Sequence, residues 1–246
     1  MTIGIGIKCS EGIVLASDTQ MTVQGSHKFY ESKLYPIRIT DDGGWACFTF
    51  AGDPELMKMF RDKFGEKVAS PNYVPNSANI ASAIEETLEE SESVILNNQW
   101  GLYMLCGISI DDELLLLKTS NTTLRHVEFH DYIGVGDSSL LRQLVLILLR
   151  ESGISMKLAT AVAVYIVTKA KVFVDGCGGD TRLAQLQGGR LIIPSDSDIL
   201  TLERNVQMAE FHLSTAISRL SDSLKDEGEL EDCLQRLKNS LTELSR

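Results

Sequence analysis

The order of predicted strands and helices is the feature that most limits how this chain can fold. Alternating apolar residues predict strands within the first 52 residues, and a helical period then predicts two helices between residues 54 and 95. Strands resume from residue 101, two more helices follow between residues 138 and 172, and strands return around residues 182 to 202. Because the helices come in adjacent pairs, antiparallel sheets covered by helical layers are favoured over a doubly wound parallel sheet.

The chain opens with a predicted β-hairpin. Isoleucine occupies every second position of TIGIGIKC (residues 2–9), and a second apolar segment, IVLASD (residues 13–18), follows a short turn. Residues 21–32 are predicted to form a loop. The segments KLYPIRI (33–39) and WACFTFAG (45–52) predict the third and fourth strands.

The C-terminal part differs from the rest of the chain. Val206, Leu213 and Leu220 recur every seven residues, and leucines after Gly228 are spaced by three and four. This spacing predicts a helical hairpin with seams like those of a coiled coil. We therefore expect a main domain over residues 1–202 and a helical extension over residues 203–246, which packs on its own subunit or contacts another subunit or partner.

Composition excludes several classes of function. The formal net charge of -11 argues against a nucleic-acid-binding surface, which needs clustered lysine and arginine. No apolar run approaches the length of a membrane-spanning helix, and the N-terminus lacks the pattern of a secretory signal. Five scattered cysteines without C-x-x-C spacing predict a reducing, cytoplasmic location.

No metal or cofactor is expected. The chain has four histidines, and His130 lies four positions after His126, a spacing that would place them together on a helix. They lie instead in a segment that alternates like a strand, so the spacing does not predict a metal site. A cysteine nucleophile at Cys177 is also disfavoured, because no motif places a histidine beside it.

The second residue of the chain carries the clearest chemical signal. Removal of Met1 would leave Thr2 with a hydroxyl and a free α-amine, and the amine can act as the base for its own hydroxyl because its reference pKa is about 7.7–8.0. A nearby ammonium group held by a carboxylate would lower that pKa further. Lys33 and Asp18 are the candidates for these two roles.

The spacing of these residues resembles that of proteasome β-type subunits, within the N-terminal-nucleophile hydrolases that include HslV and the bacterial Anbu proteins. In β subunits, a threonine opens the first strand and an aspartate closes the next one sixteen residues later. A lysine then precedes an apolar strand, and a later strand ends in A-G. This chain has Thr2, Asp18 at the end of GIVLASD, Lys33 before LYPI, and TFAG ending at Gly52. It is identified as a divergent, prokaryotic, proteasome β-type or HslV-like member.

The resemblance implies a fold and a set of roles. The fold would be α+β, a four-layer αββα sandwich with the C-terminal helical hairpin added. Thr2 would be the nucleophile, Lys33 the group that tunes its amine, and Asp18 the partner that keeps Lys33 charged. Gly52 would donate its N–H to the oxyanion, and Phe50 would line the first specificity pocket.

Each of these residues also has an ordinary structural interpretation. Threonine is common in strands, Asp18 could be a polar turn residue, and Gly52 could simply end a strand. Lys33 could be solvated, with Lys28 as a nearby competitor for its role. The joint spacing and the position at the chain terminus favour the catalytic interpretation.

The sequence departs from the family at a second, supporting cluster. Where a serine is expected in a G-S-G turn, the chain has IGVGDSS, which offers Asp137 or Ser138 if the register shifts. Where Asp-x-x-Ser-Gly-Gly is expected, it has VDGCGG, with Cys177 at the serine position and Asp175 one residue out of register. The branch either orients its amine by other means, with Asp137 or Asp175, or has lost full activity.

These observations predict a threonine-type endopeptidase that acts on polypeptides within a ring or related homo-oligomer, with an ATP-dependent unfoldase as a partner. Two alternatives stay open. The chain could be an inactive structural or partner-binding subunit, or it could use the same fold for amide hydrolysis or transpeptidation of another substrate.

Overall fold

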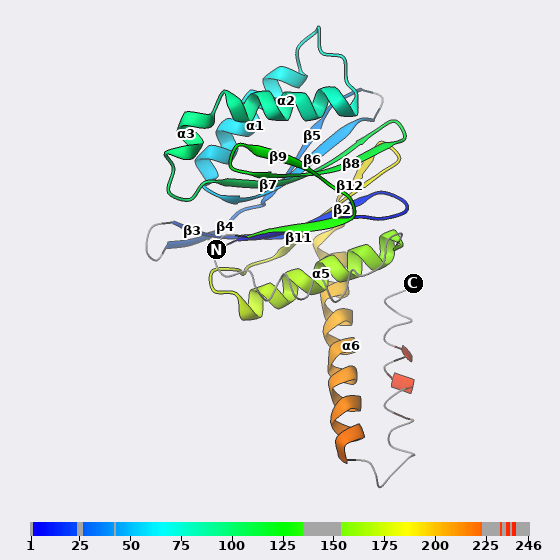
Figure 1. Ribbon diagram of the computed structural model, residues 1–246. Coiled ribbons are helices and arrows are strands. Elements are labelled where there is room, and N and C mark those ends of the chain that lie inside the picture. The colour runs from blue at the N-terminus through cyan, green and yellow to red at the C-terminus, as the bar shows by residue number, and fades with distance from the viewer. Residues whose placement is uncertain are drawn as a thin grey trace.

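The computed structural model describes residues 2–23, 27–41, 43–134 and 154–222, together with residues 232, 235, 236, 238 and 239 near the C-terminus. Two five-stranded antiparallel sheets lie face to face, with helices on their outer faces (Figure 1). The predicted α+β class with antiparallel sheets is confirmed.

The first sheet contains the predicted hairpin. Its strand order is β10-β1-β2-β11-β12, and these strands comprise β10 (His130–Gly134), β1 (Ile3–Lys8), β2 (Ile13–Asp18), β11 (Thr181–Gln187) and β12 (Arg190–Ile192). Within the hairpin, Gly4 pairs with Ser17, and across β2 and β11, Asp18 pairs with Thr181. The hairpin register therefore places the start of β1 beside the end of β2.

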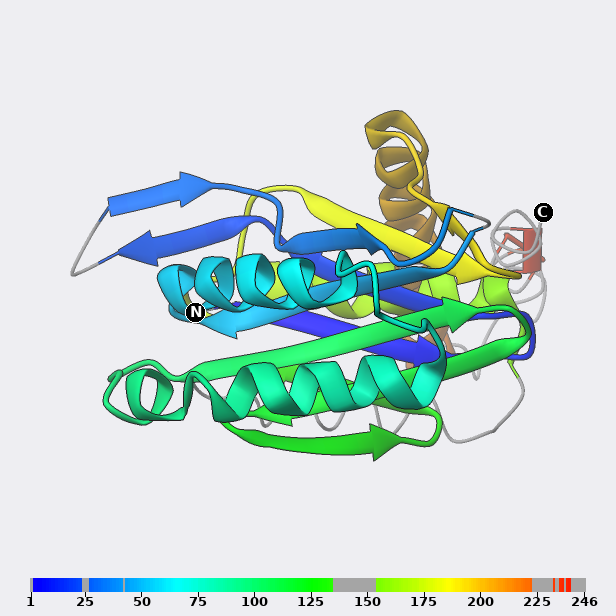
Figure 2. The same ribbon diagram turned by 90° about the horizontal axis from the view of Figure 1, so that it is seen from above.

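The second sheet follows the chain order of its strands, namely β5 (Leu34–Arg38), β6 (Trp45–Gly52), β7 (Leu102–Ile110), β8 (Glu113–Ser120) and β9 (Thr123–Val127). The prediction of a loop over residues 21–32 was wrong. Part of that segment forms a separate two-stranded ribbon of β3 (Gln20–Val23) and β4 (His27–Tyr30), which extends beyond the sheets (Figure 2).

Strand alternation assigns each face of the second sheet to a different core. In β6, Phe48 and Phe50 face α1 (Pro54–Val68) and α2 (Ser77–Glu89), whereas Cys47 and Ala51 face the first sheet. The Phe48 ring meets the rings of Phe60 and Phe64 from α1 edge-on, with centroids 5.6 and 5.2 Å away. The apolar period of α1 is thus explained by its contact with this sheet.

On the outer face of the first sheet lies α5 (Met156–Phe173), which packs on the isoleucines of β1. A short helix, α3 (Glu92–Leu96), follows α2. The helix expected over residues 138–152 lies outside the described residues. The four-layer sandwich therefore stays a prediction, because one of the helices expected to build it was predicted over that segment. Among the described residues, no helix is long and apolar enough to cross a membrane.

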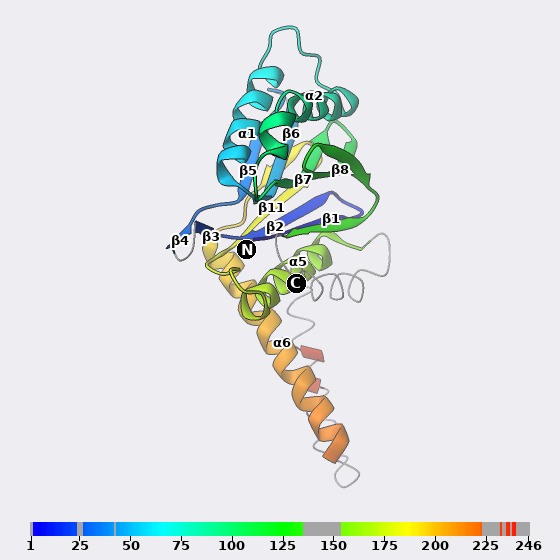
Figure 3. The same ribbon diagram turned by 60° about the vertical axis from the view of Figure 1, so that its left-hand side comes forward.

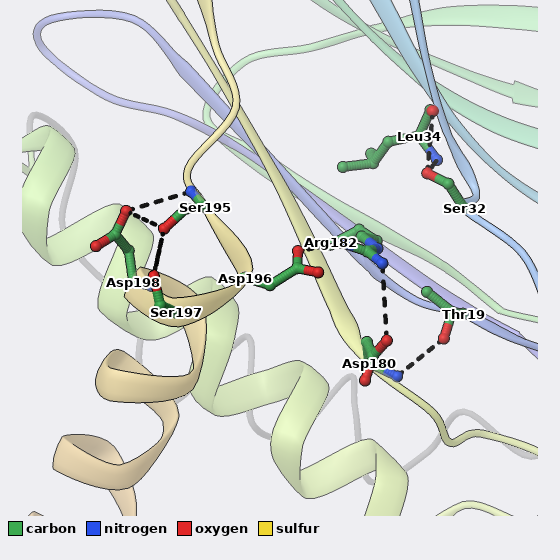
Figure 4. A network of polar contacts seen from close by, with 9 residues as sticks. All are labelled: Thr19, Ser32, Leu34, Asp180, Arg182, Ser195, Asp196, Ser197 and Asp198. Carbon is green, nitrogen blue, oxygen red and sulfur yellow. Dashed lines mark hydrogen bonds and ion pairs between the residues drawn. The ribbon is translucent and has the colours of Figure 1, made fainter.

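Helix α6 (Asp196–Asp222) extends away from the sheets (Figure 3). Residues 196–202 were expected among the last strands and instead begin this helix. The reason is local, because the Asp198 N–H donates to the Ser195 hydroxyl while the Ser195 N–H donates to the Asp198 carboxylate, a reciprocal cap (Figure 4). The predicted domain boundary at residue 203 falls inside α6, and the domain division stays a prediction.

Candidate active site

A buried ion pair lies at the centre of the candidate site. The Lys33 Nζ atom lies 2.6 Å from Asp18 Oδ1, and both side chains are 0% exposed. A fully buried lysine is unusual, because removing its charge from water is costly unless the charge is paired. The structure therefore excludes the interpretation of Lys33 as a solvated lysine. The competitor, Lys28, is exposed on β4.

The Asp18 carboxylate is held by backbone groups from two other segments. The Ile3 N–H donates to Oδ1 and the Gly178 N–H donates to Oδ2, each at 3.1 Å. With Lys33 this makes three donors for one buried carboxylate, so both of its oxygens accept hydrogen bonds. Asp18 therefore links the start of the chain, Lys33 and the turn after α5.

Burial also changes the proton affinity of the lysine. Desolvation lowers the pKa of Lys33 below its ordinary value of 10.5, and the attraction of Asp18 only partly opposes this effect. Its ammonium also donates to the main-chain oxygen of Gln20 at 2.5 Å. Lys33 is thus fixed in position and releases a proton more readily than a lysine in water.

Thr2 is connected to this pair through the next residue of the chain. Its side chain is half-buried, and the following residue, Ile3, donates its N–H to the same Asp18 oxygen that binds Lys33. The first strand therefore starts at the ion pair. The structure brings Thr2, Asp18 and Lys33 to one end of the hairpin, as the spacing predicted, while their catalytic roles stay predictions.

Gly52 ends β6 in a conformation that favours glycine. Its φ is +116°, and a Cβ at this position would lie 2.2 Å from the main-chain oxygen of Gly101. Phe50 is only 1% exposed, and its ring lies 5.4 Å from that of Tyr35 in the helix-facing core. Whether Phe50 lines a specificity pocket stays a prediction.

The turn after α5 is attached to the end of β2. The Thr19 and Gln20 N–H groups donate to the Gly178 oxygen, and the Asp180 N–H donates to the Thr19 hydroxyl at 2.9 Å (Figure 4). A Cβ on Gly179 would meet the same hydroxyl at 2.4 Å. Gly179, whose φ is +71°, is therefore needed for this close approach.

Cys177 occupies this turn and is buried. Desolvation and the neighbouring Asp18 carboxylate raise the pKa of its thiol to about 12, although Lys33 opposes the shift. The thiol is therefore neutral near pH 7 and a poor nucleophile. Asp175 is exposed in the same turn. Asp137 and Ser138, the other predicted supporting residues, lie outside the described residues.

Sequence reasoning missed three polar side chains near the site. Ser17, Gln20 and Thr49 are each at least 95% buried, and each has a side-chain atom without a hydrogen-bond partner among the described residues. A signal was present for Thr49. Its strand, WACFTFAG, is apolar on both faces, and Thr49 is the one hydroxyl-bearing residue in it.

A second surface feature lies away from these residues. A depression of 720 Å³ between α1 and α2 is lined by charged and polar side chains that include Lys67, Tyr73 and Glu86. It lies on the outer side of the second sheet, opposite the face that carries Thr49. Within it, Lys67 forms ion pairs with Glu86 and Glu90, so the charge of this lysine is already balanced by carboxylates.

Comparison by sequence does not identify a family. The chain matches no protein-family model, and no curated protein sequence matches it. The fold is nevertheless shared with solved structures of Anbu proteins. A Gly-1 mutant of Anbu from Hyphomicrobium sp. strain MC1 has a TM-score of 0.72 and 13% identity, and the match covers 92% of this chain and 99% of that one.

Two further Anbu structures give the same result. Anbu, described as an ancestral beta-subunit, from Yersinia bercovieri has a TM-score of 0.71 at 13% identity, with 92% of this chain and 98% of that chain covered. The helical assembly of the Anbu complex from Pseudomonas aeruginosa has a TM-score of 0.67 at 12% identity, with coverages of 91% and 97%.

These structures correct the predicted family assignment. The chain was expected to be a proteasome β-type or HslV-like protein, but the similar structures are Anbu proteins, so the HslV-like assignment was wrong. At 12–13% identity the likeness establishes the fold and carries no residue roles. The chain therefore has the fold that these Anbu structures share.

Proposed function

We propose that this protein is a threonine-type endopeptidase of a proteasome-related assembly, with Thr2 as the nucleophile after removal of Met1. The observation that carries the proposal is the fully buried Lys33–Asp18 pair at the start of the first strand. A buried, desolvated lysine is costly to maintain, and such groups cluster at functional sites. A purely structural salt bridge would not need to adjoin the chain terminus.

The proposed reaction begins when the Thr2 hydroxyl oxygen attacks a peptide carbonyl and its proton passes to the Thr2 α-amine. The Gly52 N–H would donate to the oxyanion that forms. The amine then returns the proton to the leaving nitrogen, which leaves an acyl ester on Thr2. Water activated by the same amine cleaves the ester and restores the free hydroxyl.

In this mechanism Lys33 acts on Thr2 through its charge. A positive group close to the α-amine lowers the pKa of the amine, so that a larger fraction is unprotonated near neutrality. The contacts with Asp18 and the Gln20 oxygen keep Lys33 in place for this effect. No metal or cofactor takes part in the proposed mechanism.

We also propose the wider organisation that accompanies this activity. The helical and sheet layers would complete a four-layer αββα sandwich, and copies of the chain would assemble into a homo-oligomer in the cytoplasm. The Anbu complex from Pseudomonas aeruginosa forms a helical assembly, which supports an oligomer for this chain as well. Polypeptides would be the substrates, and an ATP-dependent unfoldase would supply them.

Mass spectrometry and peptide hydrolysis test the proposal together. We expect the intact mass to lack Met1, because a retained Met1 would leave Thr2 without a free amine. A panel of fluorogenic peptides should be hydrolysed by the wild type and not by Thr2→Ala, which preserves the backbone. Equal turnover by both proteins would refute the role of Thr2.

One observation favours an inactive subunit as the second candidate. Cys177 stands where a supporting serine was expected, and its thiol is buried with a pKa of about 12, so it cannot shuttle a proton near neutrality. A wild-type protein that lacks Met1 but hydrolyses no peptide in the panel would support this alternative.

A further inference from the structure

Two hydroxyl groups near Thr2 have no protein partner among the described residues. Ser17 and Thr49 are both 0% exposed, and the hydroxyl oxygen of each is buried without a hydrogen bond. Most buried hydroxyls in native proteins bond to protein groups or to ordered water, because an unsatisfied one disfavours folding. Valine or alanine would fill the same positions without this cost, so the two hydroxyls call for an explanation.

Both side chains enter the same space between the two sheets. Ser17 is the register partner of Gly4, so the two residues project to the same face of the first sheet. From the opposite sheet, Thr49 Oγ1 lies 2.8 Å from the position that a Cβ on Gly4 would occupy. Directly opposed residues have Cβ atoms about 4.5–5.5 Å apart. The two hydroxyls therefore both border Gly4, one from the neighbouring strand and one from the opposite sheet.

The same face leads to Thr2. Side chains alternate along a strand, so alternation continued from β1 (Ile3–Lys8) puts Thr2 on the side that carries Gly4. A Cβ on Gly4 would lie within 2.9 Å of Thr49, so the glycine is what lets Thr49 approach this strand. Thr49 is also the register partner of Leu34, the residue that follows Lys33. Gly4, which both hydroxyls border, thus lies two residues along the chain from the proposed nucleophile, and Thr49 lies beside the strand that follows Lys33.

We propose that Ser17 and Thr49 hold one buried water molecule between the sheets, and that this water hydrogen-bonds toward Thr2 and fixes its hydroxyl for attack. A buried water needs two to four polar partners, and the three hydroxyls supply them. Substrate cannot reach Ser17 or Thr49, since both are fully buried. They are therefore positioning residues. Their effect on catalysis rests on the proposed function, whereas the bound water itself does not.

A set of near-isosteric variants tests this role. Thr49→Val and Ser17→Ala each remove one hydroxyl and little volume, and Thr49→Ser keeps the hydroxyl. The matched control is Thr168→Val, because the Thr168 hydroxyl is also buried without a described partner but lies on α5, on the other face of the first sheet. All variants are measured in full-length protein from which Met1 has been removed.

For Thr2-dependent peptide hydrolysis, we expect Thr49→Val and Ser17→Ala to lower kcat by about tenfold or more at unchanged KM, because a small displacement of a reacting group can cost about 10²-fold. Thr49→Ser and Thr168→Val should keep near-wild-type kcat. The double variant should be no slower than the worse single one, since both hydroxyls hold the same water. Wild-type kcat in both single variants, or multiplied losses in the double variant, would overturn the proposal.

Thermal unfolding separates this inference from the proposed function. If wild type shows no Thr2-dependent hydrolysis, the peptidase proposal fails, but the water is still tested by the melting temperatures of wild type, the two single variants and the double variant. A shared water predicts that the shifts from Ser17→Ala and Thr49→Val are not additive. Additive shifts, or a rise in melting temperature with each hydroxyl removed, as expected for hydroxyls that bond to nothing, would overturn it.

Discussion

At the scale of single residues, burial decides the chemistry of the site. Asp18 and Lys33 compensate each other's charge at zero exposure, and two backbone N–H groups complete the environment of the carboxylate. The charges of Asp18 and Lys33 have opposite effects on the pKa of the Cys177 thiol, and burial raises that pKa so that the thiol is neutral near pH 7. The same loss of solvent therefore favours proton release from the lysine and opposes it in the cysteine.

The ion pair gives the first prediction. Lys33→Met should destabilise the protein by about 3–5 kcal/mol, because it leaves the Asp18 carboxylate buried without its cation. The double variant Asp18→Asn/Lys33→Met removes both charges, so it should recover part of this loss while remaining inactive. Urea unfolding measures both effects. An unchanged unfolding midpoint in Lys33→Met would show that the pair is not buried in solution.

The raised pKa of Cys177 gives a second prediction. At pH 8 in the folded protein, iodoacetamide should leave Cys177 unmodified, because the thiolate is the reactive form and the thiol pKa is about 12. Peptide mapping by mass spectrometry detects the modification, and protein unfolded in urea provides the fully labelled control. Cys9, Cys47 and Cys106 are also buried and should be protected.

The same shift has a consequence for stability. Between the ordinary thiol pKa of 9.0 and the folded value of about 12, the unfolded chain loses the Cys177 proton while the folded chain keeps it. Unfolding is therefore increasingly favoured as the pH rises through this range. Wild type should lose stability relative to Cys177→Ala above pH 9, and pH-independent differences would contradict the burial of the thiol.

At the scale of secondary structure, turns and strand ends bring the residues of the site together. Gly52 ends β6 with a positive φ, and its position against the Gly101 oxygen leaves no room for a side chain. Only glycine fits there without strain. The turn after α5 is attached to β2 differently, by hydrogen bonds from the Thr19 and Gln20 N–H groups to the Gly178 oxygen.

Gly52→Ala should therefore destabilise the protein by at least about 1–3 kcal/mol from backbone strain, with the contact at Gly101 adding to the loss. Gly65→Ala is the matched control. Gly65 lies within α1 and a Cβ there would meet nothing within 4 Å, so alanine should stabilise the protein by about 0.5–1 kcal/mol. Denaturant unfolding of the two variants distinguishes these outcomes, and equal effects would contradict the geometry of β6.

Periodicity and spacing predicted many of the elements and part of the site. The first hairpin, β6, α1 and α5 follow from their apolar segments. The pairing of Lys33 with Asp18 was expected from the chemistry of an N-terminal threonine and from the spacing shared with proteasome β subunits. The β3–β4 ribbon was missed because its short strands lack a continuous apolar pattern. The start of α6 was missed because its signal is the local cap at Ser195, not a period.

Ser17 and Thr49 were missed for a different reason. Each is an ordinary strand residue in its own segment, and their meeting depends on how one sheet lies on the other. Contacts between sheets join residues that are far apart in sequence, and the apolar pattern of one segment does not predict which residue of the other sheet it will meet.

At the scale of the whole molecule, α6 presents two apolar faces. Ile199, Val206 and Ala209 are buried against the body, whereas Met208 and Phe211 are 50% and 62% exposed on another side of the helix. Apolar side chains of this size on a projecting helix are typical of contacts between subunits. If copies of the chain assemble as proposed, this face is a natural part of their contact.

The assembly yields the last prediction. Met208→Glu/Phe211→Glu places two charges on the exposed face of α6 without touching its buried face, so it should shift the protein to smaller species in size-exclusion chromatography with light scattering. Gln207→Glu adds a charge at a neighbouring exposed position without removing apolar area, and should leave the distribution unchanged. The helix should remain folded in all variants, because glutamate is a good helix former. If the double variant keeps the wild-type mass, this face of α6 takes no part in assembly, and the contacts between copies come from another part of the chain.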